Sequence, residues 1–177
     1  ARSRGPGSGA RMAAGAMKCP DRGRTAVGAA ELACFGGTVI DDERPIAELA
    51  GRARRLVAGS WWRAVGGPHV VVVAGRAGAR SSSARSSPSS ATVEIRLADG
   101  QRDVATLAHE LAHALAGIEH GHAAVFRAAE VDVLSVLAGD DHGTALRACF
   151  TSFELPVEDR AWPAPPATAG ETFVLLT

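Results

Sequence analysis

Residues 104–117, which read VATLAHELAHALAG, form the most strongly patterned segment of the chain. Apolar side chains recur there every three or four residues, which predicts an amphipathic helix that ends at Gly117. Within the segment, His109, Glu110 and His113 make the string His-Glu-x-x-His. The two imidazoles are about one helical turn apart and lie beside the apolar stripe. The segment therefore predicts a helix that packs by one face and presents two nitrogen ligands on another.

Two histidines at this spacing can bind one Zn²⁺, and Glu110 is then placed to act on a water molecule beside the metal. Catalytic zinc usually takes three protein ligands and keeps one position for water. A third ligand must therefore come from another part of the chain.

We expect the third ligand to be His122, which begins the next predicted helix after a short connection. His120, two residues earlier, is the nearest alternative. Glu130 would be the ligand in a gluzincin-type arrangement. Glu119 would require a metzincin-type turn with glycine three residues after the second histidine, but position 116 is Ala116.

The remainder of the chain has the pattern of a small α+β domain. Helical spacing of apolar residues predicts further helices at residues 24–34, 45–59, 121–137 and 144–153. A β-branched run predicts a buried strand at residues 69–73, and an alternating run predicts a half-buried strand at residues 92–97. Between them, the Ser/Gly/Arg-rich residues 76–91 are predicted to form a loop or an irregular edge strand. The sheet should be short and mixed or antiparallel.

Composition sets the expected domain boundaries. Residues 1–20 are rich in Gly, Ala and Arg and are predicted to be disordered, and the domain is expected to span residues 21–155. The Pro-rich residues 156–177 are predicted to form a flexible extension, with an edge strand at 172–176.

Charge and cysteine content exclude several classes of protein. Lys plus Arg and Asp plus Glu both number 19, so the net charge gives no general attraction to nucleic acid or anionic lipid. The three cysteines form no Cys-x-x-Cys pair, which argues against a disulfide framework and a cysteine zinc ribbon. No run approaches the roughly 18 apolar residues of a membrane span. We therefore expect a cytoplasmic protein without a membrane partner.

Residues from about Asp21 to Leu137 resemble a family of actinobacterial metallohydrolases in the wider SprT-like zincin group. The resemblance rests on the His109–His113 string, on residues 122–126 (His-Ala-Ala-Val-Phe) and on a helix leading to Glu31. It implies a small zincin-like fold that binds zinc through His109, His113 and His122, with Glu110 as general acid and base. The chain departs from the family pattern after the third histidine, where it has two alanines in place of Gly-Pro.

These observations predict a zinc-dependent hydrolase, specifically a metallopeptidase acting on a peptide or protein. If residues 92–97 form an edge strand, an extended substrate can pair with them. The chain has no tyrosine to stabilise an oxyanion, so the candidates are His142, Arg127 and whichever of His120 and His122 is not a ligand. A non-catalytic metal-binding regulatory module and a nucleic-acid-associated SprT-like peptidase are the alternatives.

Overall fold

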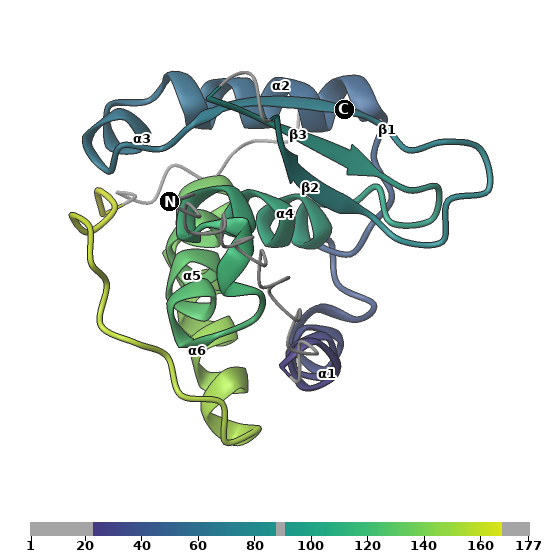
Figure 1. Cartoon of the computed structure of the whole chain (residues 1–177). Coiled ribbons are helices and arrows are strands. Elements are labelled where there is room, and N and C mark those ends of the chain that lie inside the picture. Colours follow the sequence, from purple (N-terminus) through teal and green to yellow (C-terminus); the bar gives the residue numbers. More distant parts are fainter. Residues whose placement is uncertain (1–22, 88–90, 168–177) are drawn as a thin grey trace, which may run out of the picture.

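Helices dominate the computed structural model, which describes residues 23–87 and 91–167 (Figure 1). The helices are α1 (Arg24–Phe35), α2 (Ile46–Ala58), α3 (Ser60–Ala64), α4 (Val104–Ala116), α5 (Ala124–Ala138) and α6 (Asp140–Ser152), with a short 3-10 helix η1 (Ile118–His120). The strands are β1 (His69–Ala74), β2 (Ser83–Ser86) and β3 (Thr92–Leu97). The predicted α+β class is confirmed. The predicted disordered residues 1–20 and the predicted strand at 172–176 lie outside the described residues.

The three strands form one mixed sheet in the order β1-β3-β2. β1 runs parallel to β3, with His69 opposite Thr92, whereas β2 runs antiparallel, with Ser83 opposite Arg96. β3 is therefore the central strand, so the condition under which an extended substrate could pair with residues 92–97 is not met. The edge beside the His-Glu-x-x-His helix is β2, which came from a segment without a clear strand pattern.

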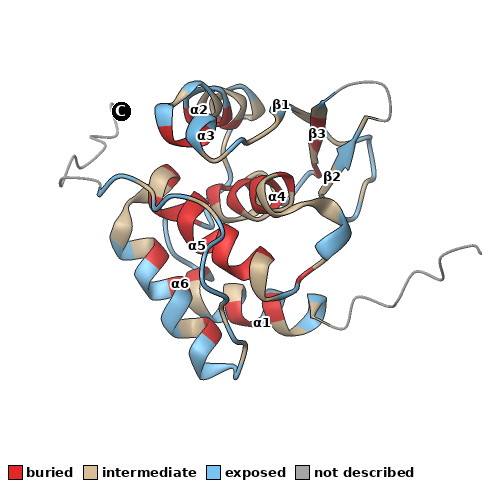
Figure 2. Ribbon diagram, turned by 60° about the vertical axis from the view of Figure 1, so that its left-hand side comes forward, coloured by how far each residue is buried: buried red, intermediate tan, exposed pale blue. Residues whose placement is uncertain are grey.

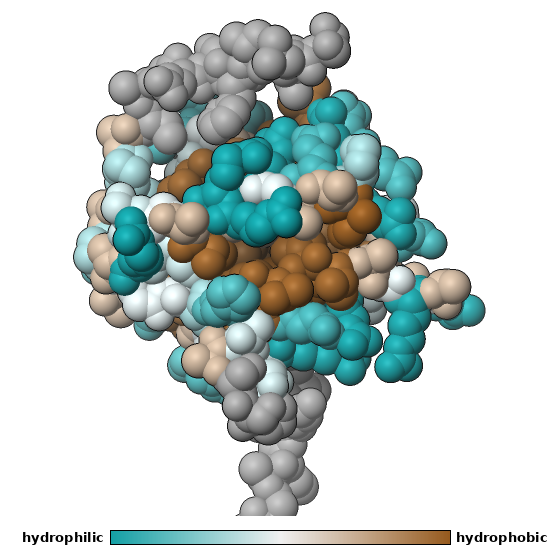
Figure 3. All heavy atoms as spheres, turned by 90° about the horizontal axis from the view of Figure 1, so that it is seen from above, coloured by the Kyte–Doolittle hydropathy of each residue, from teal (hydrophilic) through white to brown (hydrophobic). Residues whose placement is uncertain are grey.

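β1 is not the fully buried strand that its valines predicted. It lies at the other edge of the sheet, and only Val70 is buried while Val71 is 41% exposed. Figure 3 shows apolar side chains at the surface of the face seen from above, beside polar ones.

In the described part of the chain, none of the helices combines the length and the apolar character needed to cross a bilayer.

The core lies between the sheet and the helices α4 and α5. Val93, Ile95 and Leu97 of β3 are all buried, and α4 contributes Leu107 and Leu111 to the same cluster. α5 packs between α4 and α6, and most of its length is buried (Figure 2). Its polar residues therefore need partners inside the protein.

Local signals fix both ends of α4. The helix begins at Asp103, whose Oδ1 accepts a hydrogen bond of 2.6 Å from the backbone N–H of Thr106. It ends at Gly117, whose φ is 98°. Glycine adopts a positive φ with little strain because it has no Cβ. Gly121 also has a positive φ, of 52°, so the chain reverses within a few residues before α5.

The first part of the predicted flexible extension lies against the helices. Both carboxylate oxygens of Asp132 accept hydrogen bonds of 2.8 Å from Arg160, and the indole N–H of Trp162 donates to the same group. The indole N–H of Trp61 donates to the carbonyl of Pro163. Asp132 is 1% exposed, so these contacts also satisfy a buried charge of α5.

Candidate metal centre

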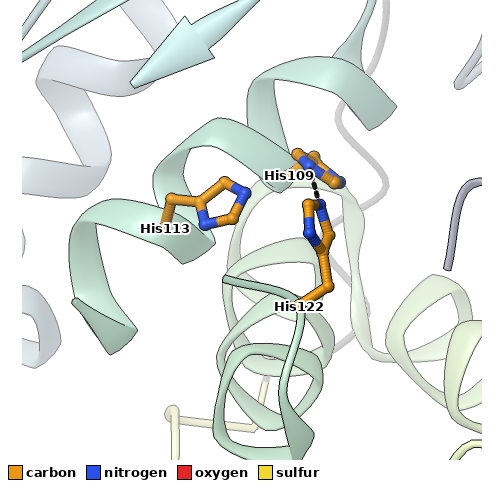
Figure 4. Close-up of side chains that lie close together, drawn as sticks. All are labelled: His109, His113 and His122. Atoms are coloured by element: carbon orange, nitrogen blue, oxygen red, sulfur yellow. Dashed lines mark hydrogen bonds between the residues drawn. The ribbon is translucent and has the colours of Figure 1, made fainter. Parts of the chain in front are cut away.

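Three imidazoles meet where α4 faces the start of α5 (Figure 4). α4 supplies His109 and His113, and the loop before α5 supplies His122. One nitrogen of each ring lies within 4.8 Å of the others, and the Nε2 atoms of His109 and His122 are 3.1 Å apart. The structure therefore brings the three predicted ligands together in a group that can hold a metal ion.

The loop that carries His122 is fixed from two sides. Nη1 of Arg127 donates a hydrogen bond of 2.6 Å to the carbonyl of His122, and Nε of Arg127 donates to the carbonyl of Pro156. The start of α1 presses against the same loop, because a Cβ at Gly23 would lie 2.9 Å from the His122 carbonyl oxygen. His122 is consequently buried, with 6% of its surface exposed.

The alternatives to His122 lie elsewhere. The His120 side chain is 50% exposed, and its nearest acidic partner, Glu119, is more exposed still. Neither residue belongs to the metal-holding groups found in the described residues. Glu130 is buried in α5, but it lies near Nδ1 of His109 rather than with His113 and His122.

Phe126 forms a common support for the three rings. Its ring centroid lies 4.9 Å from that of His109, 4.3 Å from that of His113 and 4.9 Å from that of His122. Phe126 is fully buried and lies one helical turn beyond His122. The spacing of histidine and phenylalanine in the sequence thus places an apolar platform beneath the cluster.

Glu31 of α1 is the residue at this site that the sequence reasoning missed. Its Oε1 lies 2.6 Å from Nδ1 of His109, and its carboxylate is also hydrogen-bonded to Glu130. The available signal was weak: Glu31 is the single acidic residue of a helix rich in alanine. Glu31, Glu130 and His109 form a second group of close ligand atoms on the other side of the His109 ring.

The carboxyl groups of Glu31 and Glu130 differ in charge: Glu31 is ionised, and Glu130 is held in its neutral form. Burial alone would raise the pKa of Glu31, but the hydrogen bond to Glu130 and the charge of His109 outweigh it and lower the pKa to about 2. Burial, followed by the charge of Glu31, holds the pKa of Glu130 well above its ordinary value. Burial lowers the pKa of His109, but the neighbouring Glu31 raises it by more. Glu31 is therefore the ionised partner of the imidazole.

Glu110 lies on the wall of a cleft of about 280 Å³ that also exposes His109 and His122. Glu110 is 6% exposed and accepts a hydrogen bond from the backbone N–H of Ala84 in β2. Burial raises the pKa of Glu110, and the charge of His109 and the Ala84 hydrogen bond oppose that rise only in part. The carboxyl group is thus held beside the imidazoles, and its pKa is higher than that of an ordinary glutamate.

The predicted oxyanion stabilisers do not reach this cleft. Arg127 donates to two backbone carbonyls, and neither His142 nor His120 lines the cleft. Among the described residues, Arg24 is the only lysine or arginine in the cleft wall. Its charge is close enough to oppose the pKa shifts of His109 and Glu110.

Comparison with protein-family models, curated proteins and solved structures found no match. The resemblance to the actinobacterial metallohydrolases therefore remains a prediction. The donor set itself fits a metal ion, since three clustered imidazoles suit zinc and neighbouring transition metals.

Proposed function

We propose that this protein is a zinc-dependent hydrolase with a zincin-like fold, and specifically a metallopeptidase. The observation that carries the proposal is a cluster of three imidazoles with a buried carboxyl group, Glu110, beside them in an accessible cleft. Three protein ligands are typical of catalytic zinc, which keeps a further position for water or substrate. A purely structural site would instead be closed by a fourth protein ligand.

Glu110 is the proton carrier in this proposal. Zinc, when bound, would lower the pKa of a coordinated water toward ~7 and polarise a substrate carbonyl. Glu110 accepts the proton of the attacking water and then delivers it to the leaving amine. Its raised pKa suits both tasks, because a proton carrier works best when its pKa is close to the working pH. The Ala84 N–H holds the carboxylate in position.

Substrate would bind along the cleft, close to the edge strand β2. Because β2 is an edge strand that contacts α4, whereas β3 is the central strand, an extended peptide would pair with β2. Arg24, as the cation in the cleft wall, is the candidate oxyanion stabiliser in place of Arg127, His142 and His120.

The first experiment is metal analysis of purified wild type and of three alanine variants. His109→Ala and His122→Ala should lose stoichiometric zinc, whereas the control His120→Ala should retain it because His120 lies outside the cluster. Stoichiometric zinc in His122→Ala would show that the third ligand is wrongly assigned.

The second experiment tests catalysis with a mixture of unstructured peptides and mass-spectrometric detection of products. Glu110→Gln should keep its zinc and lose hydrolysis by about 10²- to 10⁴-fold, the usual contribution of a general acid–base group. Unchanged hydrolysis in this variant would remove Glu110 from the mechanism.

Neither the regulatory-module nor the nucleic-acid alternative gains a specific observation from residues 23–87 and 91–167.

A further inference from the structure

α1 reaches the proposed metal centre through one side chain. Glu31 is 78 residues away from His109 in sequence, yet its carboxylate contacts the Nδ1 atom of that ring at 2.6 Å. Both side chains are about four-fifths buried, with 19% of each exposed. A contact this short between two largely buried polar groups restricts how the imidazole can turn.

The two nitrogens of His109 serve different partners. Nδ1 faces Glu31, while Nε2 lies 3.1 Å from Nε2 of His122 and on the side of the three-imidazole group. Because the two ring nitrogens point in different directions, a proton held on Nδ1 leaves the Nε2 lone pair directed at the cluster. Only that tautomer can bind a metal between His109, His113 and His122.

Glu31 is itself held in place by Glu130. Glu130 projects from α5, is 1% exposed and is hydrogen-bonded to Glu31. Its Oε1 lies 3.8 Å from Nδ1 of His109, which is beyond a direct hydrogen bond. The order of contacts is therefore Glu130 to Glu31 to His109, running from the centre of α5 to the metal position.

We propose that Glu31 is a positioning residue of the metal centre, which accepts the Nδ1 proton of His109 and so fixes the tautomer and direction of that ligand. The proposal rests on the metal centre described under the proposed function. Carboxylates that orient ligating histidines in this way raise metal affinity, and their loss typically lowers it by about 10- to 100-fold.

The test measures the zinc dissociation constant by competition with a chromophoric chelator. Glu31→Gln keeps the size of the side chain and removes its charge, so it should weaken zinc binding by about tenfold or more. Glu31→Asp, which keeps the charge, should recover part of the loss. Glu48→Gln is the matched control, since Glu48 is a helical glutamate paired with Arg52 in α2, outside the metal-holding groups.

A second readout separates positioning from folding. Visible absorption of the Co²⁺-loaded protein reports ligand geometry, and it should change in Glu31→Gln but not in Glu48→Gln. The Co²⁺ spectrum would show altered geometry even if Glu31→Gln melted at a lower temperature. A melting temperature alone would not decide the question.

The outcomes distinguish this inference from the proposed function. If His109→Ala binds zinc as tightly as wild type, the metal centre itself is wrong. If binding depends on His109 but Glu31→Gln stays within about twofold of wild type, only the positioning role is overturned. A loss in Glu31→Gln larger than in His109→Ala would make Glu31 a direct ligand and would also contradict the proposal.

Discussion

Gly143→Ala should destabilise the protein, because Gly143 of α6 touches α5 with no room for a side chain. A Cβ at this position would lie 1.9 Å from Oγ of Ser135 and 2.8 Å from the carbonyl oxygen of Val131. The hydroxyl can rotate away only by losing its 3.0 Å hydrogen bond to Val131. The backbone oxygen cannot move without displacing α5. The two helices must therefore separate.

The size of the effect follows from two opposing contributions. Forcing extra atoms into a packed contact costs about 1–3 kcal/mol, and a backbone neighbour places this case at the upper end. Replacing glycine by alanine within a helix offsets up to about 1 kcal/mol of that cost. The net loss is then about 2 kcal/mol, which lowers the melting temperature of a protein of this size by roughly 4–8 °C.

The assay is thermal unfolding followed by circular dichroism in the presence of a chelator, with Gly51→Ala as the matched control. Gly51 lies within α2, and the nearest atom to a Cβ there is Nη1 of Arg55 at 3.6 Å, an ordinary contact. That variant should be more stable than wild type by about 0.5–1 kcal/mol. A Gly143→Ala protein that melts at or above the wild-type temperature would refute the close contact between α5 and α6.

Three further predictions concern titratable groups. Glu31 raises the pKa of His109 in the folded protein above its ordinary value of 6.5, in spite of burial. The contact between Glu31 and protonated His109 therefore stabilises the folded state below about pH 6.5, and this stabilisation is lost as the pH rises through the folded pKa. The melting temperature of the metal-free protein should accordingly fall as the pH rises above about 6.5, and a His109→Gln variant should show a smaller fall. Glu130→Gln should change stability at pH 7 by less than about 1 kcal/mol, because the raised pKa keeps Glu130 protonated; a loss of several kcal/mol in chemical denaturation would contradict this. Burial and the hydrogen bond to Cys149 raise the pKa of Cys34 to about 12. Iodoacetamide at pH 8 should therefore label Cys34 far more slowly in the native protein than in urea-unfolded protein, and mass spectrometry counts the labels.

The segments with a strong local pattern were predictable from sequence. The apolar stripe through Leu107 and Leu111 gave α4, and the alternation through Val93 and Ile95 gave β3, because each pattern reflects burial of one face. Boundaries agreed where a capping signal exists, as at Gly117. The spatial grouping of three histidines also followed from the sequence, since two of them share one helix.

Features that depend on distant contacts were not predictable in the same way. β2 has the sequence Ser-Ala-Arg-Ser and is a strand because β3 offers it a free edge. Glu31 stands out only as the single acidic residue of α1, and nothing in the local sequence connects it to His109. Asp132, which holds Arg160, reads as an ordinary polar residue of a helix until the packing of α5 buries it.

The distance between Glu31 and His109 along the chain has a consequence for biosynthesis. The two residues are separated by 78 positions, and translation proceeds at about 5–20 residues per second, so roughly 4–16 seconds pass between them. During that interval α1 has been synthesised but its partner on α4 has not. The contact that orients His109 in our proposal therefore cannot form before residue 109 has been synthesised.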